Sequence, residues 1–120
     1  MKRQLLIMLA VLLSGPASAE TYYLSGNKLM GYCTNSADTD QGTADRDFCS
    51  FYLMGVVDTE SMLKKSGIWK DSFVCIPDGV QSRQLRIVFV NHMNKHREYW
   101  HESVARWVFV AFKEAWPCEQ

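Results

Sequence analysis

The chain has 120 residues, and its 13 basic and 13 acidic side chains cancel to a formal net charge of zero. At this length we expect a single domain with a core of modest size. The balanced charge gives no indication of a nucleic-acid-binding surface, which would need a marked excess of basic residues.

Residues 1–19 have the three parts of a secretory signal peptide. A basic start is followed by an unbroken apolar run over residues 5–13 and by the small-residue cleavage site Ala-Ser-Ala. The apolar run is too short to span a membrane, which takes about 20 residues. We therefore expect cleavage after Ala19 and delivery of the mature domain, residues 20–120, to the periplasm without a membrane anchor.

Apolar residues recur at helical spacing through the rest of the chain, and no segment reads convincingly as a strand. The expected helices span about residues 26–33, 44–65, 82–95 and 102–116. Thr43 is a plausible N-cap for the second helix, Gly67 ends it, and Pro117 ends the fourth. The fourth helix is apolar on two faces, so we expect it at the centre of a bundle or shared with a second subunit.

The four cysteines are Cys33, Cys49, Cys75 and Cys118, with separations of 16, 26 and 43 residues. An even number in a small secreted chain indicates disulfides, and a zinc site would need closer pairs. If the helices run up and down, Cys33 and Cys49 lie at one end, and Cys75 and Cys118 at the other. Because bridged Cα atoms lie within about 7 Å, we expect the pairs Cys33–Cys49 and Cys75–Cys118. The predicted fold is all-α, a small bundle of four to five helices stapled by two disulfides.

Catalytic and metal-binding patterns are incomplete. His92 and His96 are spaced i, i+4, a spacing at which two histidines can share a metal ion. A third ligand is missing unless the following turn brings His101 back, so we expect no metal and no cofactor. The predicted disulfides leave no free thiolate as a nucleophile, and no strained turn marks a serine as one. We therefore expect no catalytic residues and no enzymatic activity.

Two predicted loops carry candidate partner-binding residues. Asp38, Asp40 and Asp45 lie in a polar loop over residues 34–45 and could complement a basic rim around an enzyme cleft. The alternative is an ordinary solvated loop whose last aspartates favour the start of the next helix. In the second loop, Trp69 either tucks into the core or anchors a protein partner.

Four stretches match the pattern of a known family: NKLMGYC (27–33), CSFYLMGVVD (49–58), VCIPDGV (74–80) and VARWVFVAFKEAWPC (104–118). In these stretches the chain resembles the Rap/Tai-type immunity proteins of type VI secretion systems. The residues that meet the family pattern are Cys49, Tyr52, Gly55, Asp58, Cys75, Pro77, Pro117 and Cys118. The last stretch departs from it at Trp107 and Phe109, where smaller residues are common.

The resemblance implies a small, disulfide-bonded, all-helical periplasmic protein, often a homodimer. Such a protein would bind and block a cognate amidase effector that cleaves peptidoglycan. The matching residues are cysteines, turn residues and helix-packing positions, so they imply a shared scaffold rather than a particular toxin. The alternative function is that of a small periplasmic structural or accessory protein with a different partner.

Overall fold

The structure is a computed structural model that describes residues 22–119. The predicted signal peptide, residues 1–19, lies outside the described residues. The helices are α2 (Gly26–Thr34), α3 (Asp40–Lys65), α4 (Ser82–Lys95), the short 3-10 helix η1 (Arg97–Tyr99) and α5 (Val104–Ala115). Within the described range, the one β pairing outside these helices is an isolated bridge between Ser25 and Ser103. The prediction of an all-α fold is therefore confirmed.

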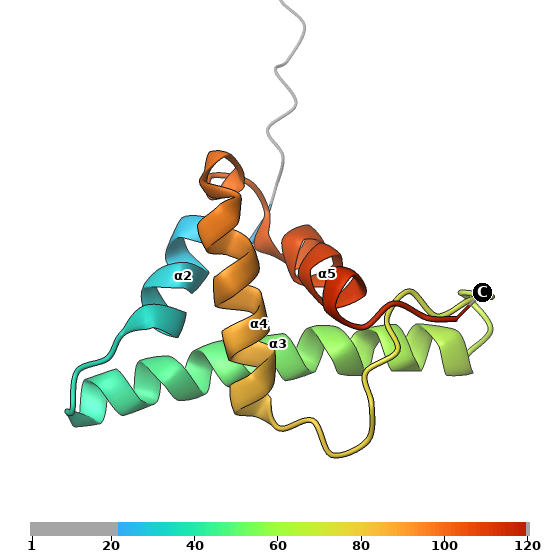
Figure 1. The fold of residues 1–120 in the computed structure, drawn as a ribbon, viewed down its shortest axis with the longest axis horizontal. Helices are drawn as coiled ribbons and strands as arrows, with labels where there is room; N and C mark the ends of the chain where they lie inside the picture. The colour runs from blue at the N-terminus through green and yellow to red at the C-terminus, as the bar shows by residue number, and fades with distance from the viewer. Residues whose placement is uncertain (1–21, 120) are drawn as a thin grey trace, which may run out of the picture.

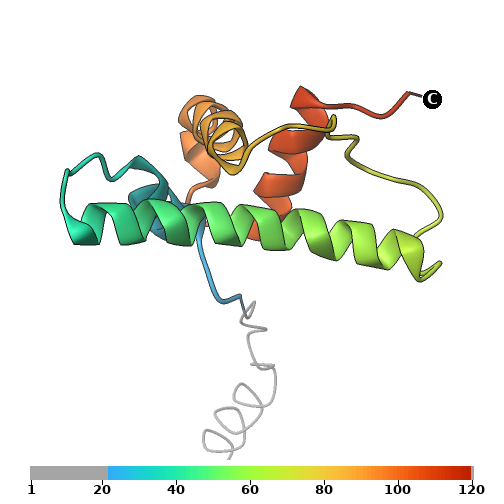
Figure 2. The ribbon, with the colours of Figure 1, turned by 90° about the horizontal axis from the view of Figure 1, so that it is seen from below.

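The longest helix, α3, is the platform on which the other three α-helices pack. Its 26 residues correspond to about 39 Å of helix. α2 lies along its first half, α4 crosses its middle and α5 lies over its second half (Figure 1). In Figure 2, α4 is seen nearly end-on while α3 lies lengthwise. The axes of α3 and α4 therefore cross steeply.

The up-and-down arrangement of the helices, from which the cysteine pairs were predicted, is wrong. Antiparallel neighbours are favoured by short connections, whereas α3 and α4 are joined by the long segment 66–81. This segment runs back from the end of α3 toward its middle (Figure 1). The connection therefore has the length to place α4, of 14 residues, across α3 rather than alongside it.

The helix α3 begins earlier than predicted. Thr39 rather than Thr43 is its N-cap, and the Thr39 hydroxyl accepts a hydrogen bond from the backbone N–H of Gly42 at 3.0 Å. The guanidinium of Arg46 holds the preceding turn by donating, at 2.8 and 3.1 Å, to two backbone carbonyls within residues 35–37. The predicted polar loop is therefore shorter, and its last residues belong to α3.

The fourth predicted helix, α5 (Val104–Ala115), is shorter than the range 102–116 that we expected for it. The backbone N–H of Val104 donates to the carbonyl oxygen of Leu24 at 3.1 Å, and Ser103 pairs with Ser25. These contacts hold residues 102–103 against the segment before α2. The helix therefore starts at Val104.

The hydrophobic core lies where α2, α4 and α5 meet the middle of α3. Phe89 of α4 is fully buried, and α5 contributes the largest number of core side chains. The buried apolar residues are Leu29, Met30, Cys33, Cys49, Leu53, Leu85, Phe89, Met93, Val104, Trp107, Val108, Ala111 and Phe112. None of the helices within residues 22–119 combines the length and apolarity of a membrane span.

Both predicted disulfides are present. Cys33–Cys49 joins the end of α2 to α3, with Cα atoms 5.1 Å apart. Cys75–Cys118 joins the segment after α3 to the segment after α5, with Cα atoms 4.9 Å apart. The second bridge is reinforced by a hydrogen bond of 3.0 Å from the backbone N–H of Cys75 to the carbonyl oxygen of Trp116. The C-terminal segment is therefore fixed to the loop that follows α3.

Candidate functional site

An apolar surface is centred on Phe109 of α5, and we call it the Phe109 surface. Three hollows of about 460, 380 and 290 Å³ adjoin at this side chain. The apolar side chains come from α3, from the loop after it and from α5. They are Phe51, Val56, Trp69, Phe73, Phe109 and Val110. The helix α3, the loop that directly follows it and the distant helix α5 thus build one continuous surface.

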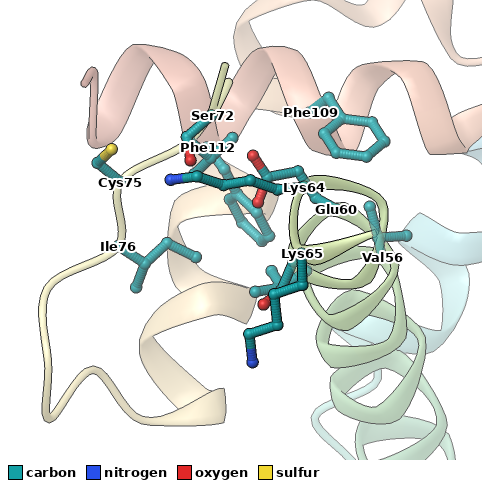
Figure 3. A pocket seen from close by; sticks show the side chains of 12 residues that line it. Val56, Glu60, Lys64, Lys65, Ser72, Cys75, Ile76, Phe109 and Phe112 are labelled. Atoms are coloured by element: carbon teal, nitrogen blue, oxygen red, sulfur yellow. The ribbon is translucent and has the colours of Figure 1, made fainter. Parts of the chain in front are cut away.

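The largest hollow lies between the second half of α3, the loop after it and α5 (Figure 3). Glu60 and Lys64 project from α3, while Phe109 and Phe112 come from α5. Glu60 is only 6% exposed. One of its carboxylate oxygens accepts a hydrogen bond of 2.9 Å from the backbone N–H of Phe73. Glu60 therefore fastens the loop to α3 and shapes the wall of the hollow.

Trp69 is partly buried at the edge of the Phe109 surface. Its ring meets those of Phe73 and Phe109 edge-on, at centroid distances of 5.0 and 6.0 Å. Its backbone N–H donates to the carbonyl oxygen of Leu63 at 3.1 Å, which ties the loop to the end of α3. Part of the ring lines the smallest of the three hollows. Trp69 therefore lies outside the core, and its role as a partner anchor stays a prediction.

The three candidate aspartates differ in their surroundings. Asp38 and Asp40 are exposed, the first before α3 and the second in its first turn. Asp45 is partly buried, and its carboxylate accepts hydrogen bonds from the side-chain amides of Asn35 (2.7 Å) and Gln41 (2.6 Å). Asp45 therefore supports the start of α3, whereas Asp38 and Asp40 remain available to a partner.

The structure separates the two predicted binding loops. The acidic residues lie at the first end of α3, and Trp69 follows its last turn, at the opposite end of the molecule's long axis (Figure 1). An interface of standard size buries about 800 Å² per partner, which is roughly 30 Å across. One such interface does not readily cover both ends of a helix of about 39 Å. The candidate residues therefore form two separate surfaces.

The residues of the family pattern occupy mixed environments. Tyr52 is partly buried on α3, and this burial raises the pKa of its hydroxyl above the ordinary value of 10.0. Gly55 and Asp58 are exposed on the same helix. Pro77 and Pro117 are exposed in the two segments that the second disulfide joins. The pattern therefore includes surface positions on α3 as well as structural ones.

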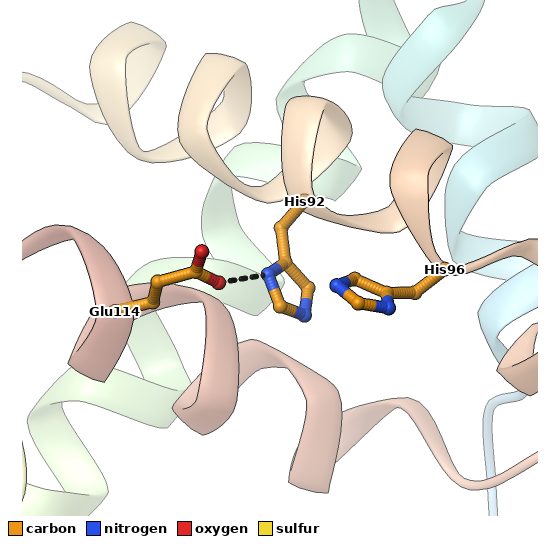
Figure 4. Close-up of side chains that lie close together, drawn as sticks. All are labelled: His92, His96 and Glu114. Carbon is orange, nitrogen blue, oxygen red and sulfur yellow. Dashed lines mark hydrogen bonds and ion pairs between the residues drawn. The ribbon is translucent and has the colours of Figure 1, made fainter.

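A cluster of two imidazoles and a carboxylate lies where α4 ends against α5 (Figure 4). His92 is buried on α4, and its Nδ1 is 2.8 Å from Oε2 of Glu114 on α5. The ring of His96 lies 4.5 Å from that of His92, centroid to centroid. Potential ligand atoms of the three residues all lie within 4.8 Å of one another. This cluster has the donor types of a transition-metal site.

The third member of this cluster was not predicted from the sequence. The spacing of His92 and His96 pointed to His101 as the nearest additional ligand, but His101 is exposed and is not part of the cluster. Glu114 lies on a different helix, and the periodicity of α5 gave no signal that it faces α4. Its position follows from the way in which α5 packs on the core.

Comparison with known proteins gives one result. The model of a protein family described as Rap1a immunity proteins matches residues 25–118. The match includes helices α2 to α5, both disulfides and the Phe109 surface. No match was found among curated proteins or among solved structures.

Proposed function

The chain belongs to the Rap1a immunity protein family, and we propose that it protects its own cell by binding a peptidoglycan-cleaving amidase effector of a type VI secretion system. The encounter takes place in the periplasm, where the effector reaches the cell wall. Residues 1–19 act as the signal peptide, and residues 20–120 form the mature inhibitor. Inhibition is by occlusion of the effector's active site and not by a chemical reaction.

Family membership is the observation that carries this proposal. Immunity proteins bind a partner effector, which favours this function over a general accessory role in the periplasm. The two disulfides support an oxidising compartment, because such bridges form and persist outside the reducing cytosol. The amidase activity of the effector rests on the resemblance of the sequence pattern to the Rap/Tai-type proteins.

The Phe109 surface supports binding by occlusion. Phe51 and Phe73 are 67% and 47% exposed, and aromatic side chains are the commonest anchors of protein interfaces. Arg106 and Lys113 border the hollow beside Trp69, so the apolar centre has a basic rim. We propose that Trp69 and Phe73 anchor the effector, because their rings lie at the edge of the Phe109 surface beside this basic rim.

A homodimer is the second part of the proposal. Phe51 and Gly55 lie one helical turn apart on the exposed side of α3. Apart from the adjoining residues and the surrounding turns of the α3 backbone, no atom lies within 4 Å of the position that a Cβ on Gly55 would take. A second copy of the chain can therefore approach the backbone of α3 closely at this point. This face adjoins the Phe109 surface at the hollow lined by Phe51, Gly55 and Phe109, whereas the proposed effector anchors, Trp69 and Phe73, lie in the loop after α3.

The test is co-expression of the cognate effector, directed to the periplasm, with the full-length protein or with a version that lacks residues 2–19. We expect survival with the full-length protein and lysis without the signal peptide. Equal protection by the two versions contradicts the periplasmic part of the proposal. Lysis in both strains, with both proteins detected, contradicts the inhibitory function itself.

Variants then locate the surface. Trp69→Ala should reduce effector binding about 30-fold or more, because interface anchors contribute roughly 2 kcal/mol or more. The double change Asp38→Lys and Asp40→Lys tests the acidic end. Ile87→Ala is the matched control, since Ile87 is an exposed apolar residue of α4 away from both surfaces. Binding unaffected by the Trp69 change, with unchanged helical content, excludes the loop as the anchor.

A further inference from the structure

The cluster at the end of α4 contains a buried nitrogen without a partner. His92 is 7% exposed, and its Nε2 has no hydrogen-bond partner among the described residues. Buried polar atoms in native proteins are almost always satisfied. An unsatisfied ring nitrogen in a buried histidine therefore points to a ligand that completes the site.

The contact with Glu114 determines the tautomer of His92, that is, which ring nitrogen carries the hydrogen. A carboxylate only accepts hydrogen bonds, so Nδ1 of His92 carries the hydrogen and donates it to Oε2 of Glu114 at 2.8 Å. In the neutral ring the lone pair then lies on Nε2, the atom that lacks a partner. A carboxylate that orients a histidine through one nitrogen, with a metal ion on the other, is a recurrent arrangement in metalloproteins.

His96 provides the second nitrogen. It is the C-cap residue of α4, one turn after His92, and Figure 4 shows its ring facing that of His92. The side chain of His96 is 37% exposed, so it can adjust its position and leaves the site open to solvent on one side. Ligand nitrogens of a tetrahedral zinc site lie about 3.4 Å apart, given bonds of about 2.1 Å. Ligand atoms of the three residues already lie within 4.8 Å of one another, and binding through Nε2 of His92 requires His96 to turn its ring toward that nitrogen.

We propose that Nε2 of His92 and a ring nitrogen of His96 bind one divalent transition-metal ion, with Glu114 holding His92 in the required form. Imidazole donors favour Zn²⁺, Ni²⁺ and Cu²⁺ over Mg²⁺ and Ca²⁺, which prefer oxygen ligands. Water fills the remaining coordination positions on the exposed side. The bound ion fixes the last turn of α4 in the position that faces α5.

This site is separate from the surface proposed to bind the effector. Glu114 and Phe109 are five residues apart on α5, which places them about 140° apart around the helix axis. The metal site and the immunity function can therefore be tested, and can fail, independently of each other.

The experiment is a calorimetric titration of the untagged, disulfide-bonded, chelator-treated protein with ZnCl₂, NiCl₂ and CuCl₂. We expect one ion per chain, with a dissociation constant in the micromolar range. Trp107 provides a second readout, because its ring centroid lies 6.3 Å from that of His92 and 6.4 Å from that of His96. Bound Ni²⁺ or Cu²⁺ should therefore quench tryptophan fluorescence with the same midpoint.

Three variants identify the ligands. His96→Ala should weaken the binding of Zn²⁺ at least 10-fold, and Glu114→Gln should weaken it about 10-fold, as is usual when an outer carboxylate is lost. Both side chains are at least partly exposed, so the fold should survive these changes. His101→Ala is the control, because it removes the remaining histidine of a chain that has three. The proposal is overturned by a dissociation constant above 1 mM for the native protein, or by His96→Ala and His101→Ala having equal effects.

Discussion

At the scale of single residues, Glu60 links the fold to the proposed binding surface. Glutamates are rarely buried unless they are paired, and Glu60 is 6% exposed with its carboxylate on the backbone N–H of Phe73. The loop that carries Trp69 and Phe73 has no regular secondary structure of its own. Its position therefore depends on a few contacts with α3, and this hydrogen bond is one of them.

Two replacements of Glu60 distinguish the contribution of its hydrogen bond to stability from the contribution of its side-chain volume. Glu60→Ala should lower the free energy of unfolding by about 1–3 kcal/mol, because it leaves the N–H of Phe73 unsatisfied. Glu60→Gln keeps an acceptor oxygen and should cost less than about 1 kcal/mol. Urea denaturation measures both values. Asp58→Ala, an exposed acidic residue on the same helix, is the control and should change stability by less than about 0.5 kcal/mol. Equal losses for the Ala and Gln variants of Glu60 contradict this role.

At the scale of elements, α3 contains two glycines with opposite surroundings. Gly42 lies in the first turn, where an added Cβ would overlap the backbone carbonyl oxygen of Ala37. Gly55 lies mid-helix, and apart from its chain neighbours and the nearby α3 backbone no atom lies within 4 Å of the corresponding position. The turn before α3 therefore requires a glycine at residue 42. The monomer has no steric requirement for one at residue 55, which agrees with the proposal that another chain approaches there.

Alanine substitutions at these two positions should change stability in opposite directions. Gly42→Ala should destabilise the protein by more than about 1 kcal/mol, because the turn must move to accommodate the methyl group. Gly55→Ala should stabilise the monomer by about 0.5–1 kcal/mol, the usual gain for this change inside a helix. Thermal unfolding at a concentration low enough to keep the protein monomeric compares the two. If Gly55→Ala lowers the thermal stability more than Gly42→Ala does, the space described around these two glycines is wrong.

Helix positions were predictable where the signals are local. The expected range of 82–95 agrees with α4, because the apolar periodicity starts and stops at distinct polar segments. The start of α3 was not predictable, since Thr39 and Thr43 are both acceptable N-caps. The choice between them depends on Arg46, which bonds to the turn before Thr39 only once the chain has folded back.

At the scale of the whole molecule, the sequence indicated the disulfides but not the packing. The pairing of Cys33 with Cys49 and of Cys75 with Cys118 was predicted from an up-and-down arrangement of the helices, and the structure has the same pairs in a different arrangement. The steep crossing of α4 over α3 still leaves the end of α2 beside α3, and the segment after α3 beside the segment after α5. The Phe109 surface and Glu114 depend on how α5 is placed against α3 and α4. That placement is determined by how the core side chains fit together in three dimensions. The spacing of apolar residues along the sequence gives no information about this fit.

The two disulfides should differ in their access to reductant. Cys33 and Cys49 are 2% and 0% exposed within the core, whereas Cys75 is exposed and Cys118 is partly exposed. Because reduction requires direct attack on a sulfur atom, a mild reductant under native conditions should open Cys75–Cys118 first. Alkylation followed by peptide mapping should then find Cys75 and Cys118 modified while Cys33 and Cys49 remain paired. In denaturant this order should disappear.

Loss of the Cys75–Cys118 disulfide, the more exposed of the two and here called the outer bridge, should lower stability strongly while the core stays folded. The bridge spans 43 residues, and its removal should lower the free energy of unfolding by about 4 kcal/mol on the chain-entropy model, because the unfolded chain regains its freedom. The folded core lies around α4 and contains neither of these cysteines. We therefore expect the Cys75→Ala, Cys118→Ala double variant to keep its helical content in circular dichroism while its urea midpoint falls. Limited proteolysis should cut it first within residues 66–81, the connection that the bridge holds in place. First cleavage within α3 or α5, or reduction of Cys33–Cys49 before the outer pair, contradicts the view that the outer bridge fixes the binding loop onto an independently packed core.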